Sequence, residues 1–166
     1  MKKFAFPLLF ASAAVLASFT VMAPEHGSKK PVQTPALAWF DFESGYEKAA
    51  KEGKILLVDA YTDWCGWCKV MDRNTYTNAQ IIETLNANFV AVKFNPEKAK
   101  TFKFGGKTMN NDELLLWLGR GKSYGYPTSY FWTNPGKGES VLVSVGYEDP
   151  AKFAETLQTV LKRKGQ

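Results

Sequence analysis

The 166-residue sequence is poor in the residues that most often build cross-links and metal sites, since it contains two cysteines and one histidine. A framework of structural disulfides is excluded, because Cys65 and Cys68 allow only one intramolecular bridge. A tetrahedral zinc site needs about four ligands, and the single histidine, His26, is remote from both cysteines in the sequence. This inventory favours reversible chemistry at the cysteine pair over a structural metal site.

A strong excess of charge of one sign is also missing. The chain has 21 basic and 16 acidic residues, a formal net charge of +5, and the two signs are interspersed. This pattern is typical of a solvated protein surface rather than of a nucleic-acid-binding surface, so we expect no nucleic-acid partner. The composition, 45% hydrophobic and 22% charged, suits one globular domain.

A long apolar run occurs only at the start of the chain. Two lysines precede a mostly apolar stretch over residues 4–22, and small residues follow it, which is the pattern of a secretory signal. We predict a signal peptide over 1–23; an uncleaved membrane anchor is the alternative, because the run reaches the lower limit for a bilayer span. Residues 24–36 contain three prolines and no periodicity, which predicts a flexible linker. Both interpretations imply an exported domain, and we expect the periplasm.

The most informative stretch covers residues 55–71. An apolar run typical of a buried strand passes through a short polar turn to Trp64-Cys65-Gly66-Trp67-Cys68, and a helical pattern follows. We expect Asp63 to cap this helix and Cys65 to lie in its first turn. There, unpaired backbone N–H groups and the helix dipole favour a thiolate over a thiol. A reactive thiol with a second cysteine nearby predicts thiol–disulfide exchange.

The rest of the pattern alternates strands and helices. The signal is weaker between residues 96 and 125, and residues 98–109 are poorly specified. A hairpin turn is expected at 134–138 and a proline-initiated helix after Asp149. The order predicts an α/β fold in which helices cover both faces of a sheet. Strands are expected over 39–40, 54–61, 88–95, 128–133 and 141–145, and helices over 44–52, 65–73, from 77 or 78 onward, over 112–118 and over 150–164.

Three features together resemble the thioredoxin superfamily. They are Asp59, the motif Trp64-Cys65-Gly66-Trp67-Cys68-Lys69, and Gly125-Tyr126-Pro127-Thr128 before a hairpin and a C-terminal helix. More narrowly, the chain is similar to exported thioredoxin-like proteins with a Trp-Cys-x-Trp-Cys-Lys active site. The resemblance implies a thioredoxin fold over 37–166, with a central mixed β-sheet, helices on both faces and a helical insertion over 96–119 before a cis-proline.

The resemblance also implies catalytic roles. Cys65 is expected to be the attacking nucleophile, and Cys68 is expected to resolve the mixed disulfide. Asp59 matches a buried acid that moves the proton of the second cysteine, and Lys93 on the neighbouring strand is expected to pair with it. The alternative leaves Asp59 in solvent at the end of its strand, with Lys93 extending to the surface.

The remaining site residues are expected to bind substrate. Pro127 is expected to be cis, which exposes the backbone of Tyr126 for strand-like hydrogen bonds with a substrate peptide; an ordinary trans turn proline is the alternative. Exposed aromatic side chains around Cys65 would form an apolar collar that docks polypeptides, unless Trp64 lies partly in the core. The predicted substrate-binding residues are Trp64, Gly66, Trp67, Tyr126 and Thr128.

Between the cysteines, Gly66-Trp67 offers no imidazole to stabilise the thiolate, whereas strongly oxidising relatives carry a histidine there. This difference favours a reductant or isomerase. We expect a monomer that needs no cofactor besides its cysteine pair, acts on polypeptide thiols or disulfides, and receives electrons from a membrane or soluble donor. Two other classes stay open: a copper(I) metallochaperone, with Met71 as a possible thioether ligand, and a non-catalytic thioredoxin-like binding module.

Overall fold

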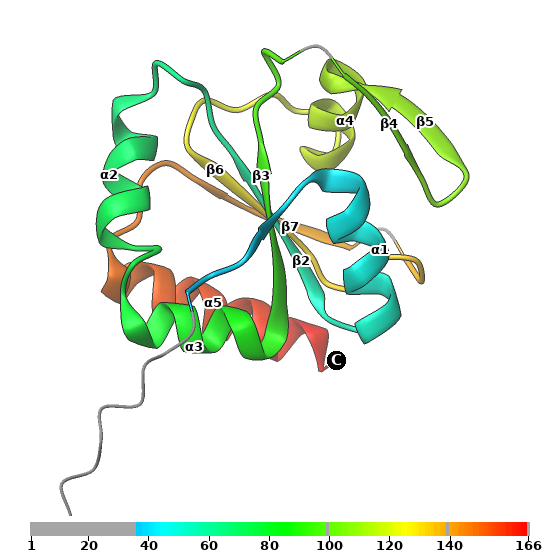
Figure 1. The fold of residues 1–166 in the computed structure, drawn as a ribbon. Helices are drawn as coiled ribbons and strands as arrows, with labels where there is room; N and C mark the ends of the chain where they lie inside the picture. The colour runs from blue at the N-terminus through cyan, green and yellow to red at the C-terminus, as the bar shows by residue number, and fades with distance from the viewer. Residues whose placement is uncertain (1–35, 99, 139, 166) are drawn as a thin grey trace, which may run out of the picture. The chain divides into compact units, whose positions relative to one another are not determined.

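The computed structural model describes residues 36–165, with the exception of residues 99 and 139 (Figure 1). The expected signal peptide over 1–23 and all but the last residue of the expected linker over 24–36 lie outside the described residues. Among the helices that are described, none is long and apolar enough to cross a membrane. The described residues correspond to the region in which the sequence predicts a folded domain.

A five-stranded mixed sheet lies at the centre of the fold (Figure 1). Its strands are β1 (Trp39–Phe40), β2 (Ile55–Ala60), β3 (Phe89–Phe94), β6 (Thr128–Trp132) and β7 (Val141–Val145). They lie in the order β1-β3-β2-β6-β7; β1 and β2 run parallel to β3, and β6 runs antiparallel to β2 and β7. All six residues of β2 are buried, as expected for an apolar strand covered on both faces.

Helices cover both faces of this sheet, as predicted. They are α1 (Phe42–Glu52), α2 (Gly66–Asn74), α3 (Ala79–Asn88), α4 (Asn111–Leu118) and α5 (Pro150–Lys164). The expected helix ends are confirmed at Gly53, which follows α1 with a left-handed φ of 63°, and at Asp149, which caps α5. α1 begins earlier than expected, because the side chain of Asp41 accepts a hydrogen bond from the backbone N–H of Ser44.

Alternate residues of the strands point into two separate apolar layers. One layer contains Phe42 of α1 and Leu114 of α4, and the other contains Met71 of α2, Leu85 of α3 and Phe153 of α5. Figure 1 accordingly shows α3 and α5 on one side of the sheet and α1 on the other. Side-chain alternation along the strands thus fixes which helix covers which face.

The insertion before the cis-proline is a β-hairpin followed by one helix, rather than helical throughout. β4 (Thr101–Phe104) and β5 (Lys107–Asn110) pair in antiparallel orientation around a Gly105-Gly106 turn in which both glycines have positive φ. The weak sequence pattern here follows from the short strands, of which only β4 alternates exposed and buried residues. α4 is the helix that the sequence predicts, and a capping box between Asn110 and Glu113 starts it.

Gly45 allows α1 to approach β3 closely, and an alanine there should destabilise the fold. A Cβ atom on Gly45 would lie 2.3 Å from Cγ2 of Val92, a buried, β-branched side chain with little rotational freedom. Overpacking costs about 1–3 kcal/mol, and the better helix propensity of alanine offsets about 0.5–1 kcal/mol of it. We expect Gly45→Ala to lower the free energy of unfolding by about 1–2 kcal/mol in urea titrations.

Gly138→Ala is the matched control, because a Cβ there would meet no atom within 4 Å. It should change the stability by less than about 0.5 kcal/mol. A Gly45→Ala variant as stable as the parent would show that α1 and β3 can separate without cost.

Candidate active site

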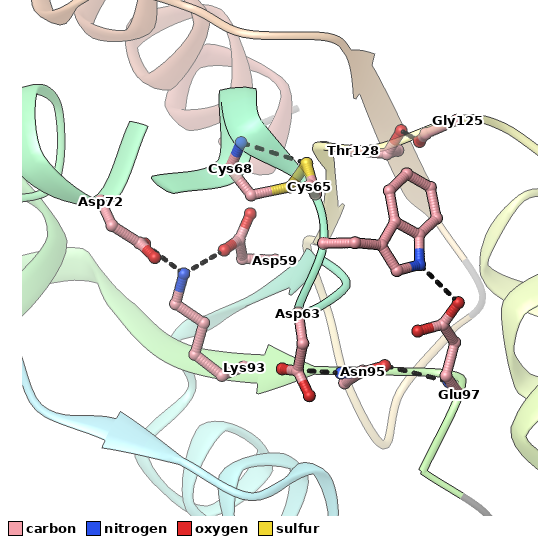
Figure 2. The surroundings of a disulfide bond; sticks show 11 residues. Asp59, Asp63, Cys65, Cys68, Asp72, Lys93, Asn95, Glu97, Gly125 and Thr128 are labelled. Carbon is pink, nitrogen blue, oxygen red and sulfur yellow. Dashed lines mark hydrogen bonds and ion pairs between the residues drawn. A yellow bond between two sulfur atoms is a disulfide. The ribbon is translucent and has the colours of Figure 1, made fainter. Parts of the chain in front are cut away.

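Cys65 and Cys68 form a disulfide at the start of α2, directly after the turn that follows β2 (Figure 2). Their sulfur atoms are 2.06 Å apart, and both residues are buried. Cys65 is itself the N-cap of α2, since its Sγ accepts a hydrogen bond from the backbone N–H of Cys68 at 3.1 Å. The sulfur of Cys65 therefore lies where backbone N–H groups and the helix dipole favour negative charge.

The expected cap by Asp63 is wrong. The backbone N–H of Cys65 donates to the carbonyl of Thr62 at 3.1 Å, and this tight turn places Cys65, rather than Asp63, immediately before the helix. The carboxylate of Asp63 instead accepts a hydrogen bond from the side-chain amide of Asn95 at 3.3 Å. The helix cap and the reactive thiol are thus the same residue.

The Tyr126–Pro127 peptide bond is cis, as predicted. Trp67 lies between the cysteines in the sequence and lines one hollow together with Tyr126 and Pro127, so the proline turn borders the disulfide region. Thr128 is fully buried, and its hydroxyl donates to the carbonyl of Gly125 at 2.6 Å. The side chain of Thr128 thus closes the turn, whereas Gly66 is exposed at the first turn of α2.

A buried carboxylate lies behind the disulfide, on β2. Asp59 is 1% exposed, which excludes the alternative of a solvated strand end, and its Oδ2 lies 2.5 Å from Nζ of Lys93. The parallel register of β2 and β3 places these two residues opposite each other. Figure 2 shows the second carboxylate oxygen of Asp59 pointing toward the disulfide, and within the described residues this oxygen has no hydrogen-bond partner.

Lys93 also pairs with a second carboxylate, that of Asp72 on α2. Its ammonium lies 4.6 Å from the ring centre of Trp39 and 5.1 Å from that of Tyr76. Burial raises the pKa of Asp59, and the positive charge of Lys93 only partly opposes this effect. Burial lowers the pKa of Lys93, but the charges of Asp59 and Asp72 outweigh it, so that the pKa of Lys93 is raised. Asp59 therefore holds a proton to a higher pH than an exposed aspartate does.

Two tryptophans flank Cys65 on the surface. Trp64 is 68% exposed and Trp67 61% exposed, so the alternative of Trp64 in the core is wrong. The indole N–H of Trp64 donates to the carboxylate of Glu97 at 2.7 Å, and its ring meets that of Tyr126 edge-on at 6.1 Å. The ring of Trp67 stacks on that of Tyr147 at 5.4 Å. The predicted aromatic collar is present, and the structure adds Tyr147 to it.

Comparisons with known proteins agree with this geometry. A family model described as "Thioredox_DsbH: Protein of unknown function, DUF255" matches residues 28–138, which is more than half of the chain. The chain belongs to the Thioredox_DsbH family.

The thiol:disulfide interchange protein DsbD of Pseudoalteromonas atlantica is 26% identical over 122 residues, which cover 73% of this chain and 18% of that protein. The DsbD of Yersinia pestis is 27% identical over 110 residues, 66% of this chain and 16% of that protein. This chain thus spans less than a fifth of the length of these relatives.

Solved structures show the same fold. A DsbH oxidoreductase superposes with a TM-score of 0.57 at 20% identity, over 84% of this chain and 94% of that one. A thioredoxin from Thermus thermophilus superposes with a TM-score of 0.60 at 21% identity, over 78% of this chain and 91% of that one. The predicted thioredoxin fold is confirmed, and so are the predicted likeness to thiol:disulfide interchange proteins and the bonded cysteine pair.

Three residues of this Thioredox_DsbH chain lie at the site but were not predicted from the sequence to belong to it. Asp72 lies four residues after Cys68, so helical spacing could have placed it on the same face of α2. Glu97 lies shortly after the end of β3, and only its hydrogen bond with the indole of Trp64 links it to the site. Tyr147 lies beyond the matched range of 28–138 and has no motif around it. Among the described residues, no group of three or more His, Cys, Asp or Glu side chains forms a metal-binding cluster.

Proposed function

We propose that this chain reduces or isomerises disulfide bonds in exported polypeptides through the Cys65–Cys68 pair. The observation that carries the proposal is the bonded pair at the start of α2, with the Asp59 carboxylate buried behind it and exposed aromatic rings in front of it. The relatives named thiol:disulfide interchange protein support the reaction class. The cysteine pair is the redox centre in this proposal, and no further cofactor takes part.

In the proposed reaction, the thiolate of Cys65 attacks one sulfur of a substrate disulfide. A mixed disulfide forms between Cys65 and the substrate, and the other substrate sulfur leaves as a thiolate, which takes up a proton. Cys68 then gives its proton to the free carboxylate oxygen of Asp59 and attacks Sγ of Cys65. The second substrate sulfur leaves as a thiolate and takes up a proton from the solvent. The substrate has then gained two electrons and two protons, and the chain holds the Cys65–Cys68 disulfide, with the proton of Cys68 on Asp59.

The electrostatics suit each of these steps. The N-cap position stabilises the Cys65 thiolate before its attack on the substrate disulfide. The raised pKa of Asp59 lets its carboxyl group hold the proton of Cys68 and later release it. Lys93 keeps one oxygen of Asp59 engaged and leaves the other free to face the cysteines.

The compartment and the electron source are part of the proposal. The lysines and apolar run within residues 1–23 support export to the periplasm, with retention at the membrane if this segment is not cleaved. A reductant outside the cytosol needs a continuing supply of electrons, so a reduced dithiol of a membrane or soluble donor must return the pair to the thiol state.

A Cys68→Ser variant is expected to test the function by trapping substrates. Without Cys68 the mixed disulfide on Cys65 has no intramolecular resolving thiol, so covalent adducts should accumulate when the variant is expressed with its N-terminal segment. Non-reducing electrophoresis should show them, dithiothreitol should release them, and mass spectrometry should identify the attached polypeptides and any donor. The Cys65→Ser/Cys68→Ser double variant is the control and should form no adduct. A Cys68→Ser variant that stays unmodified in cells would contradict a role in polypeptide disulfide exchange.

A further inference from the structure

Tyr76 is a buried titratable residue that the proposed reaction does not use. It follows α2 and is 5% exposed, and its hydroxyl has no partner in hydrogen-bond geometry within the described part of the chain. A buried polar group without a partner costs free energy, so phenylalanine would be the less costly residue if this position only filled the core. We therefore expect the hydroxyl to serve a purpose beyond packing.

The position of Tyr76 is fixed by its backbone and its ring. The backbone N–H donates to the carbonyl of Met71 at 3.1 Å. The ring meets those of Trp39 and Phe153 edge-on, with ring centres 4.9 and 5.5 Å away. None of these contacts involves the hydroxyl, so a substitution that removes only the hydroxyl leaves them in place.

Tyr76 lies on the same face of the sheet as Asp59. Along β2, Ile55 and Leu57 belong to the apolar layer that contains Tyr76, and side-chain alternation places Asp59 on that face too. The ammonium of Lys93, which pairs with Asp59, lies 5.1 Å from the ring centre of Tyr76. The second oxygen of Asp59 also lacks a hydrogen-bond partner among the described residues. A donor and an acceptor, each buried and without a partner, thus occupy the same region behind the disulfide.

The two groups act on each other electrostatically. Burial raises the pKa of Asp59, whereas the charge of Lys93 and, more weakly, donation from the Tyr76 hydroxyl lower it. The remaining charged group that faces Asp59 is Asp72 of α2, and β6 places an uncharged residue, Ser129, directly opposite. Burial and the charge of Asp59 raise the pKa of Tyr76 well above its ordinary value, so the phenol remains a donor at neutral pH. An ionised carboxylate needs such a donor, whereas a protonated one does not.

We propose that Tyr76 is a positioning residue for the second step of the reaction, in which its hydroxyl donates a hydrogen bond to ionised Asp59 and keeps this carboxylate available for the proton of Cys68. The proposal rests on the proposed function and adds a residue that acts through Asp59. The proton of Tyr76 stays on the phenol throughout, and no bond to the oxygen is broken. Without the hydroxyl, the ionised carboxylate loses a stabilising donor, so fewer molecules have a free acceptor at a given pH.

Tyr76→Phe tests the proposal, because it removes the hydroxyl and keeps the ring. Carbon-13 NMR of the carboxyl groups can follow Asp59, whose signal is identified by its absence in Asp59→Asn. The titration uses the oxidised chain, in which the bonded cysteines do not titrate and do not couple to the carboxylate. We expect Tyr76→Phe to raise the titration midpoint of Asp59 by about 0.5–1 pH unit.

The pH profile of the second step is the kinetic counterpart. When the reduced chain reacts with a symmetrical chromogenic aromatic disulfide, the first attack releases one thiol and closure of the Cys65–Cys68 bond releases the other. Below the midpoint, the second phase should be about 3–10-fold slower in Tyr76→Phe, since a shift of about 0.5–1 unit changes the ionised fraction of Asp59 by this factor. Well above the midpoint the rates should be equal, and the first phase should not change. A residue that only filled the core would not move the midpoint.

Tyr130→Phe is the matched control. Tyr130 is fully buried on β6, and its hydroxyl likewise has no partner within the described residues, but it belongs to the apolar layer on the other face of the sheet. This variant should leave the midpoint of Asp59 unchanged. An unchanged midpoint in Tyr76→Phe, or an equal shift in Tyr130→Phe, would overturn the proposal.

A second measurement covers the case that Tyr76→Phe does not fold. Incorporation of 3-fluorotyrosine into the parent makes the phenol a stronger donor, so the midpoint of Asp59 should fall, and an unchanged midpoint would overturn the proposal. The NMR titrations need no turnover and therefore separate this proposal from the proposed function. A parent protein that reduces no disulfide would contradict the proposed function, whereas only the midpoint of Asp59 decides the interaction with Tyr76.

Discussion

Cys65→Ser is expected to lose disulfide reductase activity by a factor on the order of 10³ or more, as measured by insulin reduction with dithiothreitol as donor. A serine hydroxyl stays protonated at neutral pH, so the N-cap position can no longer stabilise an anionic nucleophile. The neighbouring Cys68 cannot replace it, because Cys68 lies one turn further into α2 and not at its N-cap. The loss should therefore be nearly complete and the same for small and large substrates.

The single-cysteine variants separate the three classes of function that the sequence leaves open. If the parent shows no activity in the insulin assay beyond that of dithiothreitol alone, the chain is a binding module without turnover. A copper(I) chaperone predicts bound copper after anaerobic purification and its loss in Cys65→Ser. Thiol–disulfide exchange predicts that reduced Cys68→Ser still releases one equivalent of thiol from a chromogenic aromatic disulfide and then stops, since only the first step survives.

Features that depend on neighbours in the sequence could be predicted from it. The buried run of β2, the cap at Asp149 and the end of α1 before Gly53 were predicted because each depends on a few adjacent residues. For the cap of α3 the sequence leaves Thr77 and Asn78 open, and the structure has Asn78. The same holds for the cysteine pair at the strand–helix junction. The cap of α2 was assigned to Asp63 because aspartate is a common N-cap, whereas a sulfur in this role has no comparable sequence signal.

Features that depend on distant contacts could not be predicted. The hairpin of the insertion is held by Phe102 and Phe104 against Phe42, with ring centres 5.5 and 4.9 Å apart, and these rings are about sixty residues apart in the sequence. Tyr147 reaches the site only because the loop between β7 and α5 bends back toward α2. Local patterns therefore predict the reacting atoms, and tertiary packing determines which side chains surround them.

Asp59→Asn is expected to make the fold more stable at neutral and alkaline pH. Burial raises the pKa of Asp59 in the folded chain above its ordinary value. Below the ordinary pKa the carboxyl group is neutral in both states, and its ionisation adds no cost. As the pH rises through the raised pKa, the folded state must hold a buried charge that the unfolded chain holds in water, so stability is lost. Asparagine removes this cost, and we expect a gain of about 1–3 kcal/mol near pH 8 that shrinks toward pH 4.

The same substitution should slow catalysis, because it removes the acceptor for the proton of Cys68. Loss of a positioned acid or base typically costs about 10²–10⁴-fold, and we expect about 100-fold in the resolving step, which stopped-flow measurements can separate from the first attack. Asp72→Asn is the matched control: it removes the partner of Lys93 that is 43% exposed and leaves Asp59 in place. Its effect on stability should stay below about 1 kcal/mol.

The combination of higher stability and a slower second step is what distinguishes a proton carrier from a structural ion pair. If the contact between Asp59 and Lys93 served mainly to hold β2 and β3 together, removing one charge would leave the ammonium of Lys93 without its 2.5 Å partner and weaken the fold. Lys93 would retain Asp72 and the ring faces of Trp39 and Tyr76, which limits that loss. An Asp59→Asn variant that is less stable at pH 8 and resolves mixed disulfides at the parental rate would therefore remove Asp59 from the mechanism and leave the two sulfurs to act without it.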